Sequence, residues 1–436
     1  MAKRSIFAKI TFLFLVLMGT VFLLAFDQTG FEQIFAVKTT LFYIICGGYA
    51  GLMLLLIPES ILVGSLKVKE ALRLLRPDTW VQRLALLYLG LTVVSALLSP
   101  HKTVWLGGSR SEGVLTIALY VLCFYFVSKF FVADERLIHV FGGSVSVFSL
   151  ICLLQLCGLD PFYMYPEGYD YFDAYTAYSG AYLGTIGNVD FVAAFLCIAV
   201  PVLMLGALKI KGKARWWLWA PTVLSLCVLF WMKVMAGLVG ILGGALICLP
   251  VLLPLNRKKR ILLWSALGVA ALAGVTVLYF VDLGSGMLHE IHLLLRGQGQ
   301  DTFGSGRIYI WKSVWERMGS GFWFGHGPDT LALAEIPPFE RFDAQLGMLI
   351  KAGIDSAHNE YLNILYHQGI FALAVYIGMI GCSIYRFMRH GRKNVVAAIA
   401  GSAVICYCIQ AFFGVSQPLT TPFFWLLLGA LNYKNK

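Results

Sequence analysis

Residues 261–281 read ILLWSALGVAALAGVTVLYFV and contain no charged side chain. A run of this length is long enough to cross the roughly 30 Å hydrocarbon core of a bilayer as an α-helix. Its two flanks differ: the basic cluster 257–260 precedes it, and a long polar stretch begins at Asp282. The run therefore predicts a membrane-spanning helix with one basic end and one end that leads into a large loop.

Apolar runs of this kind recur along all 436 residues, which are 59% hydrophobic and only 13% charged. This composition excludes an ordinary soluble domain. Because the runs are apolar throughout and do not alternate, they indicate helices and not barrel strands. The sequence predicts an all-α polytopic membrane protein with about twelve spanning helices. We expect them at about 6–26, 36–57, 82–98, 113–132, 136–157, 188–208, 215–232, 235–254, 261–281, 370–388, 394–413 and 417–432.

The first run is longer than a signal-peptide core and lacks a small-residue cleavage site after it, so we expect it to be retained as a crossing. Most of the 34 Lys and Arg residues fall on the side of the N-terminus, down to Lys434 and Lys436, whereas most of the 23 acidic residues fall on the other side. The positive-inside rule then predicts that both termini are cytoplasmic. The net charge of +11 follows from this topology, and no nucleic-acid partner is expected.

The expected organisation has three parts. Residues 1–281 hold transmembrane helices 1–9, with a tyrosine-rich outer loop at 158–187. Residues 282–369 form an extracytoplasmic catalytic loop, which is too long to be structureless, and residues 370–436 hold transmembrane helices 10–12. Within the large loop, helical periodicity begins at Arg307, and a later helix is expected to be capped by Asp355 or Ser356, with His358 in its first turn.

Arg307 and His358 are the candidate catalytic pair. A guanidinium near the outer membrane surface matches phosphate oxygens in a bidentate fork. A histidine titrates near neutrality and suits a general base that takes a proton from a hydroxyl. Each residue also has a purely structural interpretation, as an interfacial anchor and as a polar residue at a helix start.

Several further residues are candidates for substrate binding. Lys233 is a cation at or just below the outer interface, where charge is costly, although snorkelling to headgroups explains it equally well. Arg110 and Glu112 stand at the outer mouth of the fourth crossing, where they either pair with each other or line one cavity. Tyr309, Asn359 and Glu360 neighbour the catalytic pair. The aromatic residues of 158–187 suit either stacking on sugar rings or an interfacial belt.

Other chemistry is not indicated. The ten cysteines lie in or beside apolar runs, and none forms a C-x-x-C pair. The sequence has neither two histidines at positions i and i+4 nor a nucleotide-binding glycine loop followed by Lys. We expect no metal site and no cofactor.

Four motifs together resemble a known family. They are Gly184-Thr185-Ile186-Gly187-Asn188, then Ser305-Gly306-Arg307 with Trp311, then Gly325-His326-Gly327, and finally Ala357-His358-Asn359-Glu360-Tyr361-Leu362 with Gly369. Their order resembles the O-antigen ligase/polymerase family, which comprises bacterial integral-membrane glycosyltransferases. The resemblance covers about residues 100–385, and its specific part runs from 184 to 369.

The resemblance implies a GT-C-like fold and essential roles for His358 and Arg307. It also implies a basic residue before the eighth crossing, where this chain has Lys233 and the family usually has arginine. Arg110-Ser111-Glu112-Gly113 is similar to an Arg-x-Glu-Gly pattern of many members. The implied reaction moves a glycan from undecaprenyl pyrophosphate to a hydroxyl of a glycan or glycolipid acceptor. It is expected to be inverting and metal-independent, at the outer face of the cytoplasmic (inner) membrane of a bacterium.

Three alternatives stay open. A polymerase of the same family would join lipid-linked repeat units to another lipid-linked chain, whereas the late position of the large loop favours a ligase. A transporter or flippase of lipid-linked sugars would tend to show inverted repeats, which are not evident in the sequence. A non-catalytic scaffold of a polysaccharide assembly complex would not depend on His358.

Overall fold

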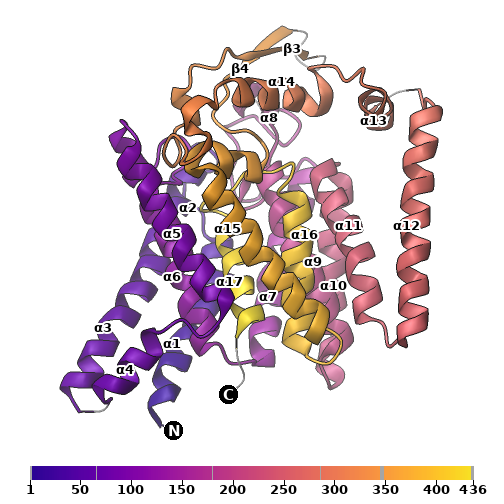
Figure 1. Ribbon diagram of the computed structural model, residues 1–436. Helices are drawn as coiled ribbons and strands as arrows, with labels where there is room; N and C mark the ends of the chain where they lie inside the picture. Colours follow the sequence, from indigo (N-terminus) through magenta and orange to yellow (C-terminus); the bar gives the residue numbers. More distant parts are fainter. Residues whose placement is uncertain (1, 65, 179, 285, 344–347, 434–436) are drawn as a thin grey trace.

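The computed structural model describes residues 2–64, 66–178, 180–284, 286–343 and 348–433 of the chain (Figure 1). It is predominantly helical, which confirms the all-α class expected from the apolar runs. Lys434 and Lys436, which carry part of the expected cytoplasmic charge, lie outside the described residues.

The first part of the chain forms a bundle with short connecting elements. Its α-helices are α1 (Ala2–Leu17), α2 (Ile34–Phe42), α3 (Gly48–Leu62), α4 (Val68–Leu75), α5 (Trp80–Leu98), α6 (Val114–Phe130), α7 (Glu135–Leu156), α8 (Ala174–Tyr178), α9 (Val189–Lys209), α10 (Trp219–Trp231), α11 (Met235–Leu252) and α12 (Arg257–Phe280). The π-helical turns η1 (Met18–Phe22) and η2 (Tyr43–Gly47), the 3-10 helices η3 (Lys102–Trp105) and η4 (Lys213–Leu218), and the strands β1 (Tyr182–Leu183) and β2 (Gly187–Asn188) connect them.

After α12 the chain builds an outer layer and then returns to the bundle. The outer layer contains α13 (Met287–Leu295), α14 (Phe303–Glu316), η5 (Gly319–Phe322), η6 (Leu331–Leu333), β3 (Phe339–Asp343) and β4 (Met348–Ala352). The closing helices are α15 (Glu360–His390), α16 (Val395–Gln410) and α17 (Thr421–Asn432).

Seven helical stretches of the described chain are long and apolar enough to span a membrane: Ile34–Leu62, Trp80–Leu98, Glu135–Leu156, Val189–Lys209, Met235–Leu252, Arg257–Phe280 and Glu360–His390. Shorter apolar helices occupy four more of the expected runs, at Ile6–Phe22, Val114–Phe130, Val395–Gln410 and Thr421–Asn432. The count of about twelve crossings therefore stays a prediction.

Two of these stretches are similar in hydropathy and opposite in their surroundings. α9 is apolar on every side and lies at the centre of the bundle, where it packs against α7, α10, α11 and α16. α12 is also apolar on every side, but none of its residues is buried, and it stands apart from the bundle (Figure 1). An all-round apolar helix suits either a protein core or lipid, so its sequence alone does not decide between them.

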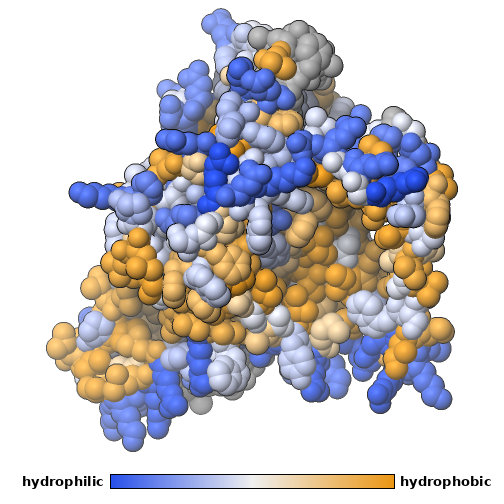
Figure 2. Space-filling model, turned by 45° about the horizontal axis from the view of Figure 1, so that its top comes forward, coloured by the Kyte–Doolittle hydropathy of each residue, from blue (hydrophilic) through white to orange (hydrophobic). Residues whose placement is uncertain are grey.

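The surface shows a band of hydrophobic side chains between two hydrophilic ends (Figure 2). α13, α14, β3 and β4 lie at one end, and α1 begins and α17 ends at the other (Figure 1). This arrangement is consistent with a bundle that crosses the membrane and carries the large loop on one side. Which side is cytoplasmic stays a prediction from the charge distribution.

The sequence led us to expect a helical outer loop, but the structure also contains two strands there. β3 and β4 form an antiparallel hairpin in which Phe339 pairs with Ala352, and an ion pair of 2.7 Å joins Glu340 to Lys351. Strands of this length contain too little alternation to stand out in a sequence. The hairpin packs on α14 through Phe339, whose ring lies against Gly306 and Tyr309.

α15 begins later than the sequence indicates. Asn359, and neither Asp355 nor Ser356, is its N-cap, because the Asn359 Oδ1 accepts from the N–H groups of Tyr361 at 3.0 Å and Leu362 at 3.1 Å. An asparagine that accepts two free N–H groups is among the strongest caps. His358 consequently lies before the helix and not in its first turn.

A sharp break divides α15 at Gly369, which has φ 84° and ψ 175°. The break leaves the carbonyls of Tyr366 and His367 free to accept from the N–H groups of His326 at 2.9 Å and Gly327 at 3.0 Å. A Cβ on Gly369 would lie 2.3 Å from the carbonyl oxygen of Trp323. The break thus holds the Gly325–Gly327 turn against the first part of α15.

Gly369→Ala should lower the melting temperature of the purified protein in detergent by several degrees. Alanine cannot adopt this backbone region without a cost of about 1–3 kcal/mol, before the clash with Trp323 is counted. Gly381→Ala, further along α15 with open space around it, is the matched control and should be neutral or stabilise by about 0.5–1 kcal/mol. Equal melting temperatures for the two variants would contradict the role of the break.

Candidate active site

His358 lies one residue before the N-cap of α15, in a left-handed conformation with φ 46°. Its N–H donates to Oγ of Ser356 at 3.2 Å. Ala357 is held from two sides, because its N–H donates to Oδ1 of Asn363 at 2.8 Å and its carbonyl accepts from Nε1 of Trp311 at 2.9 Å. Left-handed residues other than glycine are uncommon and gather at functional sites. The backbone that carries the imidazole is therefore fixed by both α14 and α15.

Arg307 follows three successive left-handed residues, Gly304, Ser305 and Gly306. This turn folds the chain back, so that Nη1 of Arg307 donates to the carbonyl of Gly304, while Nη2 donates to the carbonyl of Phe413 at 3.2 Å. Both of these acceptors are neutral. The Nε of Arg307 is buried and has no hydrogen-bond partner among the described residues. The guanidinium thus keeps its positive charge and an unused donor.

Arg110 comes from the loop that precedes α6. Its Nη2 forms an ion pair of 2.7 Å with Asp355, and its guanidinium carbon lies 5.9 Å from the centre of the Phe191 ring at the start of α9. Its Nε, like that of Arg307, is buried without a partner in the described part of the chain. The hydrogen bonds of Arg110 run to residues other than Glu112, so the structure does not pair these two residues with each other.

Asp329 organises the loop that carries Arg110, and sequence reasoning did not identify it. Its Oδ2 accepts from the N–H groups of Gly108 at 2.6 Å, Arg110 at 3.1 Å and Glu112 at 3.2 Å. Burial raises the pKa of Asp329, although the three N–H groups oppose this rise. Asp329 is itself left-handed, with φ 57°. The only sequence signal was its place after the Gly-His-Gly-Pro turn.

Glu112 faces the interior, where it accepts from the hydroxyl of Tyr120 at 3.0 Å and from that of Ser416. Burial raises the pKa of Glu112 to about 8, with a further contribution from the nearby carboxylates of Glu360 and Asp329. The two hydroxyl donors act in the opposite direction. The Glu112 carboxyl is therefore protonated more readily than that of an exposed glutamate.

Asn359 and Glu360 have their polar atoms engaged within the protein. Asn359 caps α15, as described above. Glu360 is buried, and its carboxylate accepts from the hydroxyls of Tyr376 at 2.5 Å and Tyr407 at 3.0 Å. Their contact with a substrate stays a prediction, whereas the contacts in the structure hold the start of α15 in place.

Glu112 and Glu360 line the same small enclosed cavity of about 20 Å³, together with His367 and Gln368. Nε2 of His367 and Oε1 of Gln368 are buried without hydrogen-bond partners among the described residues. A space of this size with several polar walls fits one water molecule. The cavity therefore forms a polar floor beneath the loops that carry Arg110 and His358.

The charges around His358 show which residues converge there. Burial lowers the pKa of the imidazole to about 4. Asp190 and Asp355 act to raise this pKa, while Arg307 and Arg110 act to lower it. Asp355, the ion-pair partner of Arg110, precedes His358 by three residues, and Trp311, on the same helix as Arg307, donates to the carbonyl of Ala357. The three predicted site residues therefore lie on segments that contact one another, and two aspartates not predicted as site residues act on the same imidazole. At neutral pH the imidazole is uncharged and able to accept a proton.

Lys233 and Tyr309, which were also predicted to bind substrate, are not among the residues that act on the charge of His358. Lys233 is exposed in the turn between α10 and α11, with φ 54°, and has no hydrogen bond or ion pair with any described residue. Tyr309 directs its hydroxyl to the carbonyl of Pro337 at 3.1 Å and packs against Phe339. Contact of either residue with a substrate stays a prediction.

The tyrosine-rich loop 158–187 is divided between two environments. Tyr165 and Tyr182 pack edge-on around Phe31 in a small core shared with the first outer loop. Tyr163 and Phe172 are instead among the most exposed aromatic side chains of the described residues, at 86% and 64%. Only the exposed group has ring faces available for a sugar or for the membrane interface.

The arrangement favours binding of an anion beside a base. Arg307 and Arg110 each have an unused donor and each act on the charge of the His358 imidazole. A guanidinium with free N–H groups matches phosphate oxygens in geometry. Within the described ranges, no group of three or more His, Cys, Asp and Glu side chains is arranged to hold a metal ion.

Comparison with known proteins gives one match. Residues 220–377 match a family model described as O-Antigen ligase, and no curated protein matches the chain. The matched region contains Lys233, Arg307 and His358, and Arg110 lies outside it. The match supports activity of the O-antigen ligase/polymerase type, on lipid-linked glycans in a bacterial membrane. The match over residues 220–377 supports the resemblance of the chain to the O-antigen ligase/polymerase family.

Proposed function

We propose that this protein is a glycosyltransferase that moves a glycan from undecaprenyl pyrophosphate to a hydroxyl group of an acceptor glycan or glycolipid. The reaction takes place at the outer face of the inner membrane, with both termini in the cytoplasm. The observation that carries the proposal is the pair of guanidinium groups, Arg307 and Arg110, whose buried Nε donors lack partners in the described chain close to His358. Buried donors without partners are rare in folded proteins, and a phosphate of the donor supplies the missing acceptors.

The proposed chemistry is a single displacement with inversion. The acceptor oxygen forms a bond to the anomeric carbon, while the bond from that carbon to the pyrophosphate oxygen breaks and the leaving group keeps the electron pair. His358 accepts the hydroxyl proton, and Asp190 stabilises the imidazolium that forms. Arg307 and Arg110 neutralise the charge that grows on the departing pyrophosphate, a role that Mg²⁺ takes in many transferases.

Donor binding is also expected to raise the pKa of His358, which makes the imidazole a better base. The two arginines lower the pKa of His358, and an incoming pyrophosphate offsets their charge. The imidazole becomes more basic at the moment when the donor arrives. Lys233, at the same end of the bundle in the turn before α11, is proposed to contact the pyrophosphate as a point charge. Tyr163 and Phe172 are proposed to stack on sugars.

His358→Asn and Arg307→Lys should each lower the transfer rate by about 10²–10³-fold. Asparagine tolerates the left-handed backbone at this position but is not a base, and lysine keeps the charge of Arg307 without its fork. Purified variants are incubated with an undecaprenyl-pyrophosphate oligosaccharide and acceptor, and the product is quantified.

Lys312→Ala removes a cation from α14 that forms only an exposed 2.7 Å ion pair with Asp301, and it should retain wild-type turnover. Normal product from His358→Asn would refute the base assignment. Turnover that disappears with a chelator would refute the assignment of phosphate neutralisation to arginines alone.

The pH dependence of kcat/KM should show its acidic limb near pH 4 and not near 6.5. The pKa of His358 is lowered to about 4, so the imidazole stays neutral as the pH falls through 6.5 and gains its proton only near pH 4. The acidic limb of kcat/KM reports the free enzyme. An acidic limb close to 6.5 would mean that His358 is hydrated and far from the two arginines.

Asp329→Asn should reduce kcat by about 10²-fold, because the loop that carries Arg110 shifts when its anionic acceptor is lost. Asp329 acts here as a positioning residue, so Asp329→Ala should be worse than Asp329→Asn, which keeps one oxygen acceptor. Asp301→Asn is the control, since Asp301 is an exposed aspartate of the outer loop. An Asp329→Asn variant with a lower melting temperature but unchanged kcat would indicate a structural role only.

The family includes polymerases as well as ligases, and the product separates the two. A ligase gives one glycan attached to a different acceptor, whereas a polymerase gives a ladder of chain lengths still linked to polyprenyl pyrophosphate. We propose the ligase reaction, because the single large outer loop lies late in the chain. Labelled lipid that crosses the bilayer without a new glycosidic bond would instead indicate a flippase.

A further inference from the structure

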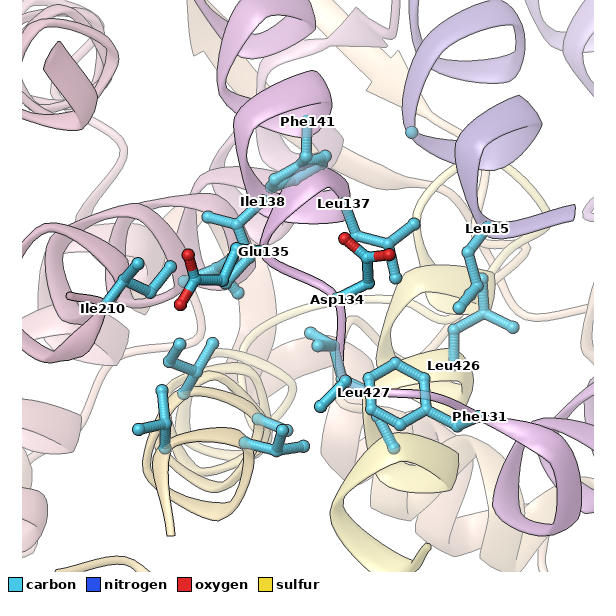
Figure 3. Close-up of a pocket in the computed structure, with 18 of the residues that line it drawn as sticks. Leu15, Phe131, Asp134, Glu135, Leu137, Ile138, Phe141, Ile210, Leu426 and Leu427 are labelled. Atoms are coloured by element: carbon cyan, nitrogen blue, oxygen red, sulfur yellow. The ribbon is translucent and has the colours of Figure 1, made fainter. Parts of the chain in front are cut away.

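A cavity of about 390 Å³ lies inside the bundle, away from the candidate active site. Side chains of α1, α7, α9, α16 and α17 form its walls, which are almost entirely apolar (Figure 3). Leu137, Ile138, Phe141 and Leu426 represent these walls in the close-up. Its size lies within the range of small-molecule sites in proteins.

Aromatic rings close the cavity toward the middle of the bundle. Phe423 lies 5.8 Å from Phe22, 5.2 Å from Phe195 and 6.5 Å from Phe141, measured between ring centres. Phe141 and Phe195 contact each other at 6.1 Å. A ligand in the cavity therefore does not arrive from the side of His358.

The other end of the cavity is charged. Asp134, Glu135, Lys209 and Lys211 form its rim, at the start of α7 and the end of α9. Arg136 neutralises Asp134 through an ion pair of 2.6 Å. In the described chain the two lysines have no carboxylate partner within ion-pair distance. The rim therefore carries the two ammonium groups of Lys209 and Lys211 and the carboxylate of Glu135 above an apolar space, so that its cations outnumber its unpaired anions.

The depth of the cavity matches one leaflet of a bilayer. From Lys209 to Ile198 the walls follow α9 for about 16 Å at 1.5 Å per residue. Half of a hydrocarbon core of roughly 30 Å is about 15 Å. One acyl chain that enters at the rim reaches the phenylalanine roof, whereas a much longer polyprenyl chain does not fit below it.

We propose that this cavity binds a glycerophospholipid of the leaflet on the side of the two termini, with one acyl chain inside and its phosphate at Lys209 and Lys211. That leaflet is the cytoplasmic one under the topology proposed above. The site is separate from the transfer reaction, because the roof of phenylalanines divides it from the outer loops. The lipid fills the apolar space between α7, α9 and α17.

The test uses protein reconstituted with phosphatidylethanolamine that carries a photoreactive diazirine at the end of one acyl chain. Illumination should label residues at the roof, such as Phe141, Ile198 and Phe423. Ala400→Phe places a ring in the cavity and should abolish this labelling. Ala266→Phe, the same change at an exposed position of α12, should leave it intact.

A second set of variants tests whether the lysines of the rim bind the lipid phosphate, without changing the volume of the cavity. Lys209→Ala with Lys211→Ala should weaken lipid retention by about tenfold, the equivalent of roughly 1.4 kcal/mol. Lys213→Ala removes a neighbouring charge that does not line the cavity and should have no effect. Roof labelling that persists in Ala400→Phe, or an equal effect of Lys213→Ala, overturns the proposal. Labelling by a polyprenyl phosphate probe in place of the phospholipid overturns it as well.

Discussion

Arg307 lies half-buried with main-chain carbonyls as its hydrogen-bond partners and one donor unused. A guanidinium is always charged, and withdrawing it from water without a carboxylate costs free energy unless an anion is supplied. Three successive left-handed residues precede Arg307, and of these only Ser305 carries a Cβ. A left-handed residue other than glycine persists only where the surrounding structure fixes it. The half-buried guanidinium therefore favours an external anion as its partner, as the proposed function requires.

Contacts among four segments hold the candidate site in place: the Arg110 loop, the Gly325–Gly327 turn, the break of α15 and the α16–α17 connection. Asp329 joins the Arg110 loop to the Gly325–Gly327 turn. The N–H groups of this turn donate to carbonyls that are exposed where α15 breaks at Gly369. The α16–α17 connection contributes the Phe413 carbonyl to Arg307. Because all of these partners belong to the protein itself, the arginines and His358 are held without the help of a substrate. Preorganisation of this kind is what electrostatic catalysis requires.

Sequence reasoning reached the helical membrane class and proposed His358, Arg307 and Arg110 as site residues, because the features behind these predictions are local; the roles of the three residues stay predictions. Apolar runs and short motifs are visible without a fold. It did not reach Asp329, Asp190 or the partners of Glu112, since their contacts join segments far apart in the chain. It placed the start of α15 too early, because Ser356, Asp355 and Asn359 are all competent caps. The central α9 and the outlying α12 were indistinguishable, since both are apolar on every side.

The most direct test is the structure of the protein with undecaprenyl pyrophosphate bound in a lipid nanodisc. The proposed reaction requires phosphate oxygens within about 3 Å of Nε of both Arg307 and Arg110, with the anomeric carbon facing the His358 imidazole. A pyrophosphate held elsewhere, for example at Lys233 alone, with both Nε donors still without partners, would contradict the account.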